Sequence, residues 1–156
     1  MSIPTLRLAK TNDLQNLEDL ESKSFTGDRL SRRSLRHFIS TNTCELWCLE
    51  EEQSLLGYGL LLFRKNSQSA RIYSLAIAPQ AQGRKLGKLL LQHLEQRALQ
   101  RPCQLVRLEV RQDNEAAIKL YKNMGYQKIK ALGSYYEDGA DGWRLQKQLK
   151  DIVIEH

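Results

Sequence analysis

The sequence predicts a mixed α/β fold in which about seven strands, mostly antiparallel, form one sheet with four helices on its faces. Strand-like alternation and helix-like spacing follow one another in the order β-α-α-β-β-β-α-β-α-β-β. Polar turns separate the three consecutive strands, as in an antiparallel meander. A strand–helix–strand unit follows them, and a crossover of this kind makes its two strands parallel. We therefore expect a parallel pair at the centre of the sheet.

Length and composition fit one domain spanning residues 1–156, with 41% apolar and 27% charged residues. No segment reaches the ~20 apolar residues that cross a bilayer, and the N-terminus lacks the apolar run of a signal peptide. We therefore expect a cytoplasmic protein that does not bind membranes. The three cysteines lack C-x-x-C spacing, which predicts free, buried thiols and no metal site. The net charge of +6 favours an anionic partner without identifying it.

The N-terminal part of the chain predicts a short strand and two helices. Residues 5–8 alternate as a strand, and a helix follows the turn at residues 11–13. Gly27 is its expected end, and its apolar stripe predicts that the buried positions are Leu14, Leu17, Leu20 and Glu21. Ser31 is the expected start of the second helix, whose inward positions are Leu35, Phe38 and Ile39.

The middle of the chain predicts a meander followed by the longest helix. The expected strands cover residues 45–50, 55–64 and 72–78, and Pro79 ends the third. Residues 85–101 then have helical spacing, with an expected inward face of Leu86, Leu89, Leu90, Leu94 and Ala98.

The C-terminal part predicts a strand, a helix and two closing strands. Residues 105–110 alternate, and Asp113 or Asn114 can cap the helix that follows. Gly125 is its expected stop, and its inward face is predicted to be Ala117, Leu120, Tyr121 and Met124. The closing strands are expected around residues 126–132 and 143–149.

The segment Gln82-Gly83-Arg84-Lys85-Leu86-Gly87-Lys88 lies where a strand leads into the longest helix. Free amides and the helix dipole make such a junction an anion site, and glycine lets phosphate oxygens approach the backbone closely. A glycine-containing turn with a solvated basic face is the alternative. The segment lacks the G-x-x-x-x-G-K-[ST] pattern of nucleotide-hydrolysing P-loops.

Two blocks of the chain resemble the GNAT acetyltransferase superfamily. Residues 75–79 and 82–87 resemble its motif A, whose signature is Q/R-x-x-G-x-G/A, and residues 108–126 resemble its motif B. The likeness is greatest to the ribosomal-protein alanine N-acetyltransferase branch. It implies acetyl-coenzyme A as acetyl donor, and it implies that the residues that hold this co-substrate are Leu75, Ala76, Ile77, Gln82, Gly83, Arg84, Lys85, Leu86, Gly87, Lys88 and Asn114.

Lys85 departs from the motif, because it stands where the family usually has its first glycine. The resemblance implies that Lys85 adopts an unusual backbone angle or that the bound phosphate is shifted. In the family, a bulge in the strand that contains Leu75–Ile77 also presents backbone groups to the pantetheine arm.

The same resemblance implies Glu109 as general base and Tyr121 as general acid. The residues themselves allow another interpretation of each. Alternation places Glu109 on one strand face with Arg107 and Arg111, so a surface ion pair is possible. Tyr121 lies on an apolar helical stripe, a pattern that by itself favours a core tyrosine.

Tyr135 and Tyr136, with acidic neighbours, resemble the loop that borders the acceptor peptide in protein N-terminal acetyltransferases, although a polar hairpin loop is the alternative. We therefore expect transfer of an acetyl group to a protein N-terminal α-amine. A small amine such as a polyamine or an aminoglycoside is the alternative acceptor. A basic nucleic-acid-binding module is disfavoured, because only 7% of the residues are aromatic and they do not interleave with the basic run. A homodimer is a common state in the family.

Overall fold

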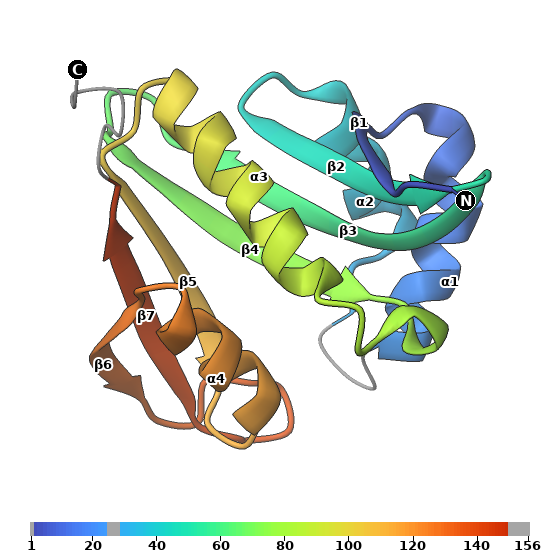
Figure 1. Ribbon diagram of the computed structural model, residues 1–156. Helices are drawn as coiled ribbons and strands as arrows, with labels where there is room; N and C mark the ends of the chain where they lie inside the picture. The colour runs from blue at the N-terminus through green and yellow to red at the C-terminus, as the bar shows by residue number, and fades with distance from the viewer. Residues whose placement is uncertain (1, 25–28, 150–156) are drawn as a thin grey trace.

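The computed structural model describes residues 2–24 and 29–149. Its strands are β1 (Thr5–Leu8), β2 (Cys44–Glu51), β3 (Ser54–Phe63), β4 (Ser69–Ile77), β5 (Leu105–Arg111), β6 (Gln127–Leu132) and β7 (Gly142–Gln148). Its α-helices are α1 (Leu14–Ser24), α2 (Arg32–Ser40), α3 (Leu86–Gln100) and α4 (Glu115–Asn123). The strands form one sheet in the order β1-β2-β3-β4-β5-β7-β6 (Figure 1). All strand pairs are antiparallel except β4 with β5, so the predicted mixed sheet and its parallel pair are confirmed.

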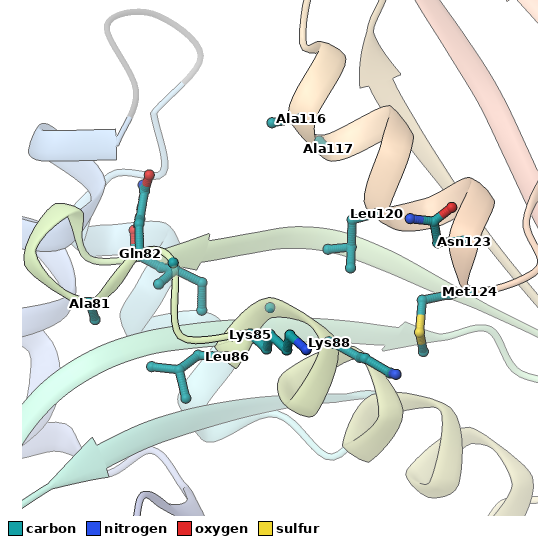
Figure 2. A pocket seen from close by; sticks show the side chains of 13 residues that line it. Ala81, Gln82, Lys85, Leu86, Lys88, Ala116, Ala117, Leu120, Asn123 and Met124 are labelled. Carbon is teal, nitrogen blue, oxygen red and sulfur yellow. The ribbon is translucent and has the colours of Figure 1, made fainter.

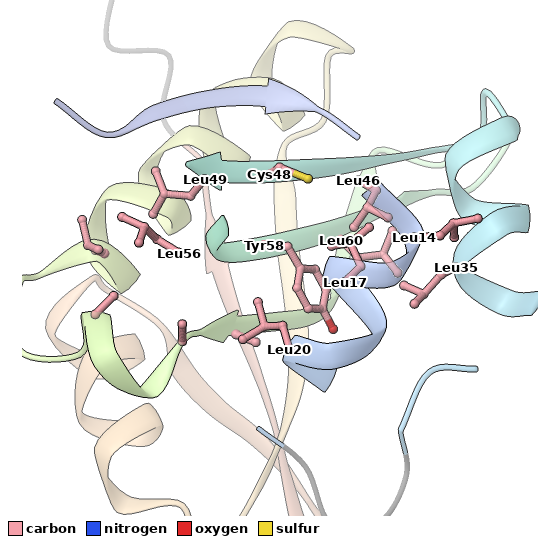
Figure 3. Packing of buried hydrophobic residues seen from close by; sticks show 14 of the residues in the cluster. Leu14, Leu17, Leu20, Leu35, Leu46, Cys48, Leu49, Leu56, Tyr58 and Leu60 are labelled. Carbon is pink, nitrogen blue, oxygen red and sulfur yellow. The ribbon is translucent and has the colours of Figure 1, made fainter. Parts of the chain in front are cut away.

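Helices α1 and α2 pack against β2, β3 and β4 on one face of the sheet. Their leucines meet Tyr58 of β3 in a closed hydrophobic cluster (Figure 3). The Ser31 hydroxyl accepts a hydrogen bond from the Ser34 amide at 3.1 Å, which confirms the predicted start of α2. The predicted inward residues of α1 are all buried, and the predicted stop at Gly27 lies outside the described residues.

Helix α3 crosses the opposite face, over β3 and β4 (Figure 1). Leu89 was expected to face the core, but it is 38% exposed, and Leu91 is buried instead. The apolar stripe is centred between Leu90 and Leu94, so that Leu89 falls on the far side of the helix. Glu95 is also buried in this interface, where its carboxylate accepts hydrogen bonds from the Tyr126 hydroxyl and the Lys147 ammonium, both at 2.8 Å. These partners compensate its burial.

The parallel pairing of β4 with β5 is short. It joins Ser69–Ile72 to Leu105–Leu108, and beyond these residues the two strands diverge (Figure 1). A register shift between Leu60 and Leu61 of β3 coincides with the divergence and leaves Tyr73 as an extra residue in β4. This bulge lies just before the Leu75–Ile77 segment. The sheet therefore opens on one side of β4 while β4 stays paired with β3.

The cysteines Cys44, Cys48 and Cys103 are free and buried, as predicted. Among the described residues, no helix combines the length and the apolar content that crossing a bilayer requires. Within the same residues, no three potential metal ligands come together.

Close packing at Gly57 of β3 gives a test of the sheet. A methyl group there would lie 2.6 Å from the Ala76 carbonyl oxygen, so the backbone must move to accept it. We expect Gly57→Ala to lower the free energy of unfolding by about 2 kcal/mol. Gly133→Ala is the matched control, since nothing lies within 4 Å of the same position at Gly133. Equal urea midpoints for the two variants would contradict this packing.

Candidate functional site

A groove of about 470 Å³ lies between the start of α3 and helix α4 (Figure 2). Its α3 wall consists of Lys85, Leu86, Gly87 and Lys88. Its α4 wall consists of Ala116, Ala117, Leu120, Asn123 and Met124. Ile77 at the end of β4 and the segment 81–83 complete the lining. The groove has the size of a small-molecule site and connects a helix N-terminus with the open edge of β4.

The N-terminus of α3 leaves backbone amides without acceptors within the helix. No side chain caps it, and its first backbone bond runs from the Leu89 amide to the Lys85 carbonyl, so the amides of residues 86–88 have no acceptor within the helix. The other two helices with a described N-cap differ, since Ser31 caps α2 and Asn114 caps α4 through side-chain oxygens. Unpaired amides and the positive end of the helix dipole favour a phosphate group.

Lys85 adopts the left-handed conformation, with φ 60° and ψ 27°. Gly83, two residues earlier, has φ 85°. Lys85 therefore adopts a backbone angle that glycine adopts without steric cost. Of the two expectations for this position, an unusual backbone angle is the one that the structure shows. The turn therefore places a cationic residue in the lining of the groove.

Seven of the eleven predicted cofactor residues line the groove, and the other four do not: Arg84, Asn114, Leu75 and Ala76. Arg84 is not part of the lining, and its guanidinium pairs with both carboxylate oxygens of Glu51 at 2.9 and 3.1 Å. Asn114 uses its side-chain oxygen to cap α4 through the Ala117 amide at 3.2 Å. Leu75 and Ala76 lie in β4 outside the lining.

The contribution of α4 to the groove was not predicted as such. Ala117, Leu120 and Met124 were expected to be core positions, yet they are only partly buried and line the groove. Their helical spacing predicted that they share one face of α4. The small side chains of Ala116 and Ala117 at the start of the helix were the feature of the sequence from which a groove on that face could have been predicted.

Beyond Ile72, the edge of β4 that faces β5 has no strand partner among the described residues. Backbone amides and carbonyls of residues 73–76 on this edge are therefore available to another extended chain, whereas the Ile77 carbonyl accepts a hydrogen bond from the Gln82 side chain at 3.4 Å. Ile77 connects this edge with the groove. A long ligand bound at the start of α3 can continue along β4 by backbone hydrogen bonds, much as an added strand does.

Glu109 is the first residue of β5 beyond the paired segment, and its side chain is 6% exposed. One carboxylate oxygen accepts a hydrogen bond from Nε of Arg71 at 2.8 Å, and the other accepts one from Nε of Arg144 at 2.9 Å. The predicted alternation of β5 is confirmed, but the arginine partners are not the expected Arg107 and Arg111. The real partners come from the neighbouring strands β4 and β7, and neither was identified as a site residue from the sequence.

Tyr121 lies in α4 on the side of the sheet opposite Glu109. It packs in the buried cluster with Val110 and contacts Tyr126 edge to face, with ring centroids 5.6 Å apart. Burial raises the pKa of Tyr121 to about 12, so the phenol retains its proton at neutral pH. A thioester would have to lie in the gap between β4 and β5 for both Tyr121 and Glu109 to approach it.

Tyr135 and Tyr136 lie in the loop between β6 and β7, with ring centroids 5.0 Å apart. The hydroxyl of Tyr135 accepts a hydrogen bond from Arg71 at 3.3 Å, which joins this loop to Glu109. Tyr135 is 42% exposed and therefore offers its ring to a ligand. The structure thus brings the predicted acceptor residue and the predicted base onto one side of the open sheet.

The loop acids have local partners of their own. Asp138 and Asp113 both pair with Arg111, at 2.9 and 3.1 Å, and Asp141 accepts a hydrogen bond from the Ser134 amide at 2.8 Å. These contacts fix the loop shape, which gives the polar-loop interpretation of this segment a physical basis as well.

Comparison with known proteins agrees with this geometry. Residues 13–126 match a family model described as the acetyltransferase (GNAT) family. An uncharacterized N-acetyltransferase of Methanocaldococcus jannaschii is 30% identical over 92% of this chain and 90% of its own length. The N-alpha-acetyltransferase RimI of Mycobacterium tuberculosis is 28% identical over 89% of each chain.

A solved structure has the same fold. The ribosomal-protein-S18-alanine N-acetyltransferase of Escherichia coli superposes with a TM-score of 0.85 at 22% identity, over 95% of both chains. The family match covers well over half of the sequence, and the groove, the uncapped helix and the open strand edge agree with it. The chain therefore belongs to the GNAT family and is an acetyl-coenzyme A-dependent N-acetyltransferase.

Proposed function

We propose that this protein is a single-domain cytoplasmic enzyme that acetylates the N-terminal α-amine of a protein. One observation carries the proposal. The groove and the open edge of β4 lead from one side of the sheet to the gap between β4 and β5. Glu109 and Tyr135 lie at this gap on the other side of the sheet. A donor that enters by the groove can therefore meet an acceptor that enters from the tyrosine loop. The three unpaired cysteines fit a reducing compartment.

The lining residues fit acetyl-coenzyme A. The free amides at the start of α3, with the side chains of Lys85 and Lys88, provide donors and positive charge for the pyrophosphate. The open edge of β4 provides donors and acceptors for the amides of the pantetheine arm. When bound, this co-substrate supplies an activated acetyl group as a thioester. Arg84 is held by Glu51 and contributes to phosphate binding only if that pair opens.

Acetyl transfer requires an N–C bond to form, the C–S bond to break and one proton to move from the amine to the leaving sulfur. Glu109 receives the amine proton, directly or through a water molecule, on a lone pair that its arginine partners leave open. Tyr121 donates its proton to the leaving thiolate. A tyrosine with pKa about 12 stays protonated until that moment, but the transfer to a thiolate of ordinary pKa ~8.5 is uphill and depends on close positioning.

The loop geometry favours a peptide over a polyamine or an aminoglycoside. A polycation needs several uncommitted carboxylates, whereas Asp113, Asp138 and Asp141 already have partners in or next to the loop. The exposed ring of Tyr135 offers a flat surface to a protruding chain end. The name of the relative from Mycobacterium tuberculosis, an N-alpha-acetyltransferase, supports the same choice.

Binding of the donor can be measured by thermal unfolding. At 100 times its dissociation constant, acetyl-coenzyme A should stabilise the protein by about 2.7 kcal/mol and raise the midpoint by about 5–10 °C. We expect Lys88→Ala to weaken binding about tenfold, because it removes a cation from the groove. Lys122→Ala is the control, since Lys122 is exposed on α4 outside the lining. The absence of any shift in the wild type would contradict the assignment of the groove.

The acceptor class can be measured with paired peptides that have a free or a blocked N-terminus, alongside spermidine and an aminoglycoside. We expect mass spectrometry to detect acetylation at the α-amine of the free peptides alone. Internal lysines in the same peptides serve as the built-in control for other primary amines. Faster turnover of either small amine than of every peptide would replace the protein acceptor with a small one.

The proton donor can be tested with Tyr121→Phe. We expect kcat to fall about 100-fold with little change in donor affinity, because the ring still fills the core while the proton is lost. Glu109→Gln is the companion variant: its residual rate should rise with pH, as the amine then has to lose its proton to solvent. A kcat within twofold of the wild type for Tyr121→Phe would remove this residue from the mechanism.

A further inference from the structure

Three arginines lie on one face of the sheet near the gap between β4 and β5, and two of them bind the carboxylate of Glu109. Arg71 and Arg144 bind Glu109, and Arg107 lies on the same face of β5, two residues before Glu109. The strand register places Arg107 directly opposite Arg71 of β4. Like charges opposite one another destabilise a sheet unless an anion lies between them or nearby.

Three of the nearby acids are already committed to partners. Glu109 is shared between Arg71 and Arg144, and the nearby acids Asp113 and Asp138 pair with Arg111. In the described part of the chain, Arg107 takes part in no ion pair, and its side chain is half-buried rather than fully solvated. The three guanidiniums and one carboxylate leave a surplus of positive charge at the place where the acceptor is expected to bind.

This face of the sheet is also accessible. Helices α1 and α2 cover the same face further along, where they contact β2, β3 and β4. Helix α4 lies on the opposite face of β5 and β7 (Figure 1). Side chains of Arg71 and Arg144 retain 31% and 27% of their exposure, so each guanidinium can still receive a ligand oxygen. An arginine that is held in place by one carboxylate is well prepared to bind a second one.

We propose that this surface, formed by Arg71, Arg107 and Arg144, binds an acidic side chain at the second or third residue of the acceptor chain end. The inference rests on the proposed function. With the acceptor amine at Glu109, Arg107 lies two strand residues away, or about 7 Å. That separation suits a carboxylate carried by the next residues of a peptide. A free amino acid could place its α-carboxylate on Arg71 or Arg144 beside Glu109, but that carboxylate is too close to its own amine to reach Arg107 as well.

The test compares three peptides that differ only at residues two and three, as Ala-Asp-Asp, Ala-Asn-Asn and Ala-Lys-Lys, together with free aspartate and glutamate. We expect kcat/KM for the acidic peptide to exceed that for the amide peptide about tenfold, and the lysine peptide to be slowest. The acidic advantage should shrink as salt is raised from 50 to about 500 mM, since partly exposed ion pairs are screened.

Arg107→Gln is the variant that assigns the preference, because it removes one guanidinium without breaking a contact to Glu109. We expect the acidic-over-amide ratio to fall to about twofold. Arg64→Gln is the matched control: Arg64 lies in the turn before β4, at the opposite end of that strand from the gap, and its loss should leave the ratio unchanged.

The possible outcomes separate this inference from the proposed function. Equal rates on the three peptides, or a preference for the lysine peptide, would overturn the acidic specificity while N-terminal acetylation stands. An acidic preference that survives Arg107→Gln would move it to another surface. Faster acetylation of free aspartate or glutamate than of the acidic peptide would overturn the chain-end acceptor. Acetylation of no peptide, with donor binding intact, would overturn the proposed function itself.

Discussion

Pairing between β4 and β5 over four residues on each strand is the constraint on which the site depends. Up to Ile72 and Leu108 the two strands share a ladder, and the buried side chains of β5 face α3 and α4. Beyond that point the bulge at Tyr73 and the continued pairing of β4 with β3 draw the strands apart. The gap exposes an edge of β4, places Glu109 at its apex and lets α4 approach the start of α3. A longer parallel ladder would pair the edge of β4, remove the gap at Glu109 and keep α4 away from the start of α3.

The start of α3 gives up local stability in favour of binding. An uncapped helix lacks the ~1 kcal/mol that a serine or asparagine cap contributes, and a left-handed lysine costs about 1–2 kcal/mol relative to glycine. Helices α2 and α4 carry such caps, so the omission at α3 is specific to the groove. Lys85 also lines the groove, so its positive charge can offset part of this backbone cost when a polyphosphate ligand binds.

Patterns in the sequence were sufficient for the element order, the cap at Ser31, the parallel pair and the glycine-containing turn before α3. They left Asp113 and Asn114 as alternative caps of α4, and the structure shows that Asn114 is the cap. The caps and the turn depend on residues a few positions apart, whereas the parallel pair joins Ser69–Ile72 to Leu105–Leu108 and follows from the strand–helix–strand order. The phase of α3 was harder, because leucine occurs on both sides of its stripe and only packing decides that Leu91 and not Leu89 is buried. The partners of Glu109 could not be read from the chain, since Arg71 and Arg144 are 38 and 35 residues away and meet it only through the sheet register.

The same register determines what Glu109 can do. A carboxylate between two guanidiniums is held in one orientation and keeps a lone pair on each oxygen, which suits a group that must receive a proton from a positioned amine. Its two partners stay charged and half-exposed, and Arg107 opposite Arg71 adds a third charge that Glu109 does not neutralise. The two arginines that hold a carboxylate at the apex of the gap therefore also give this side of the sheet a positive field. Such a field repels a polycation and attracts an anionic group, which is the physical basis of the proposed acceptor preference.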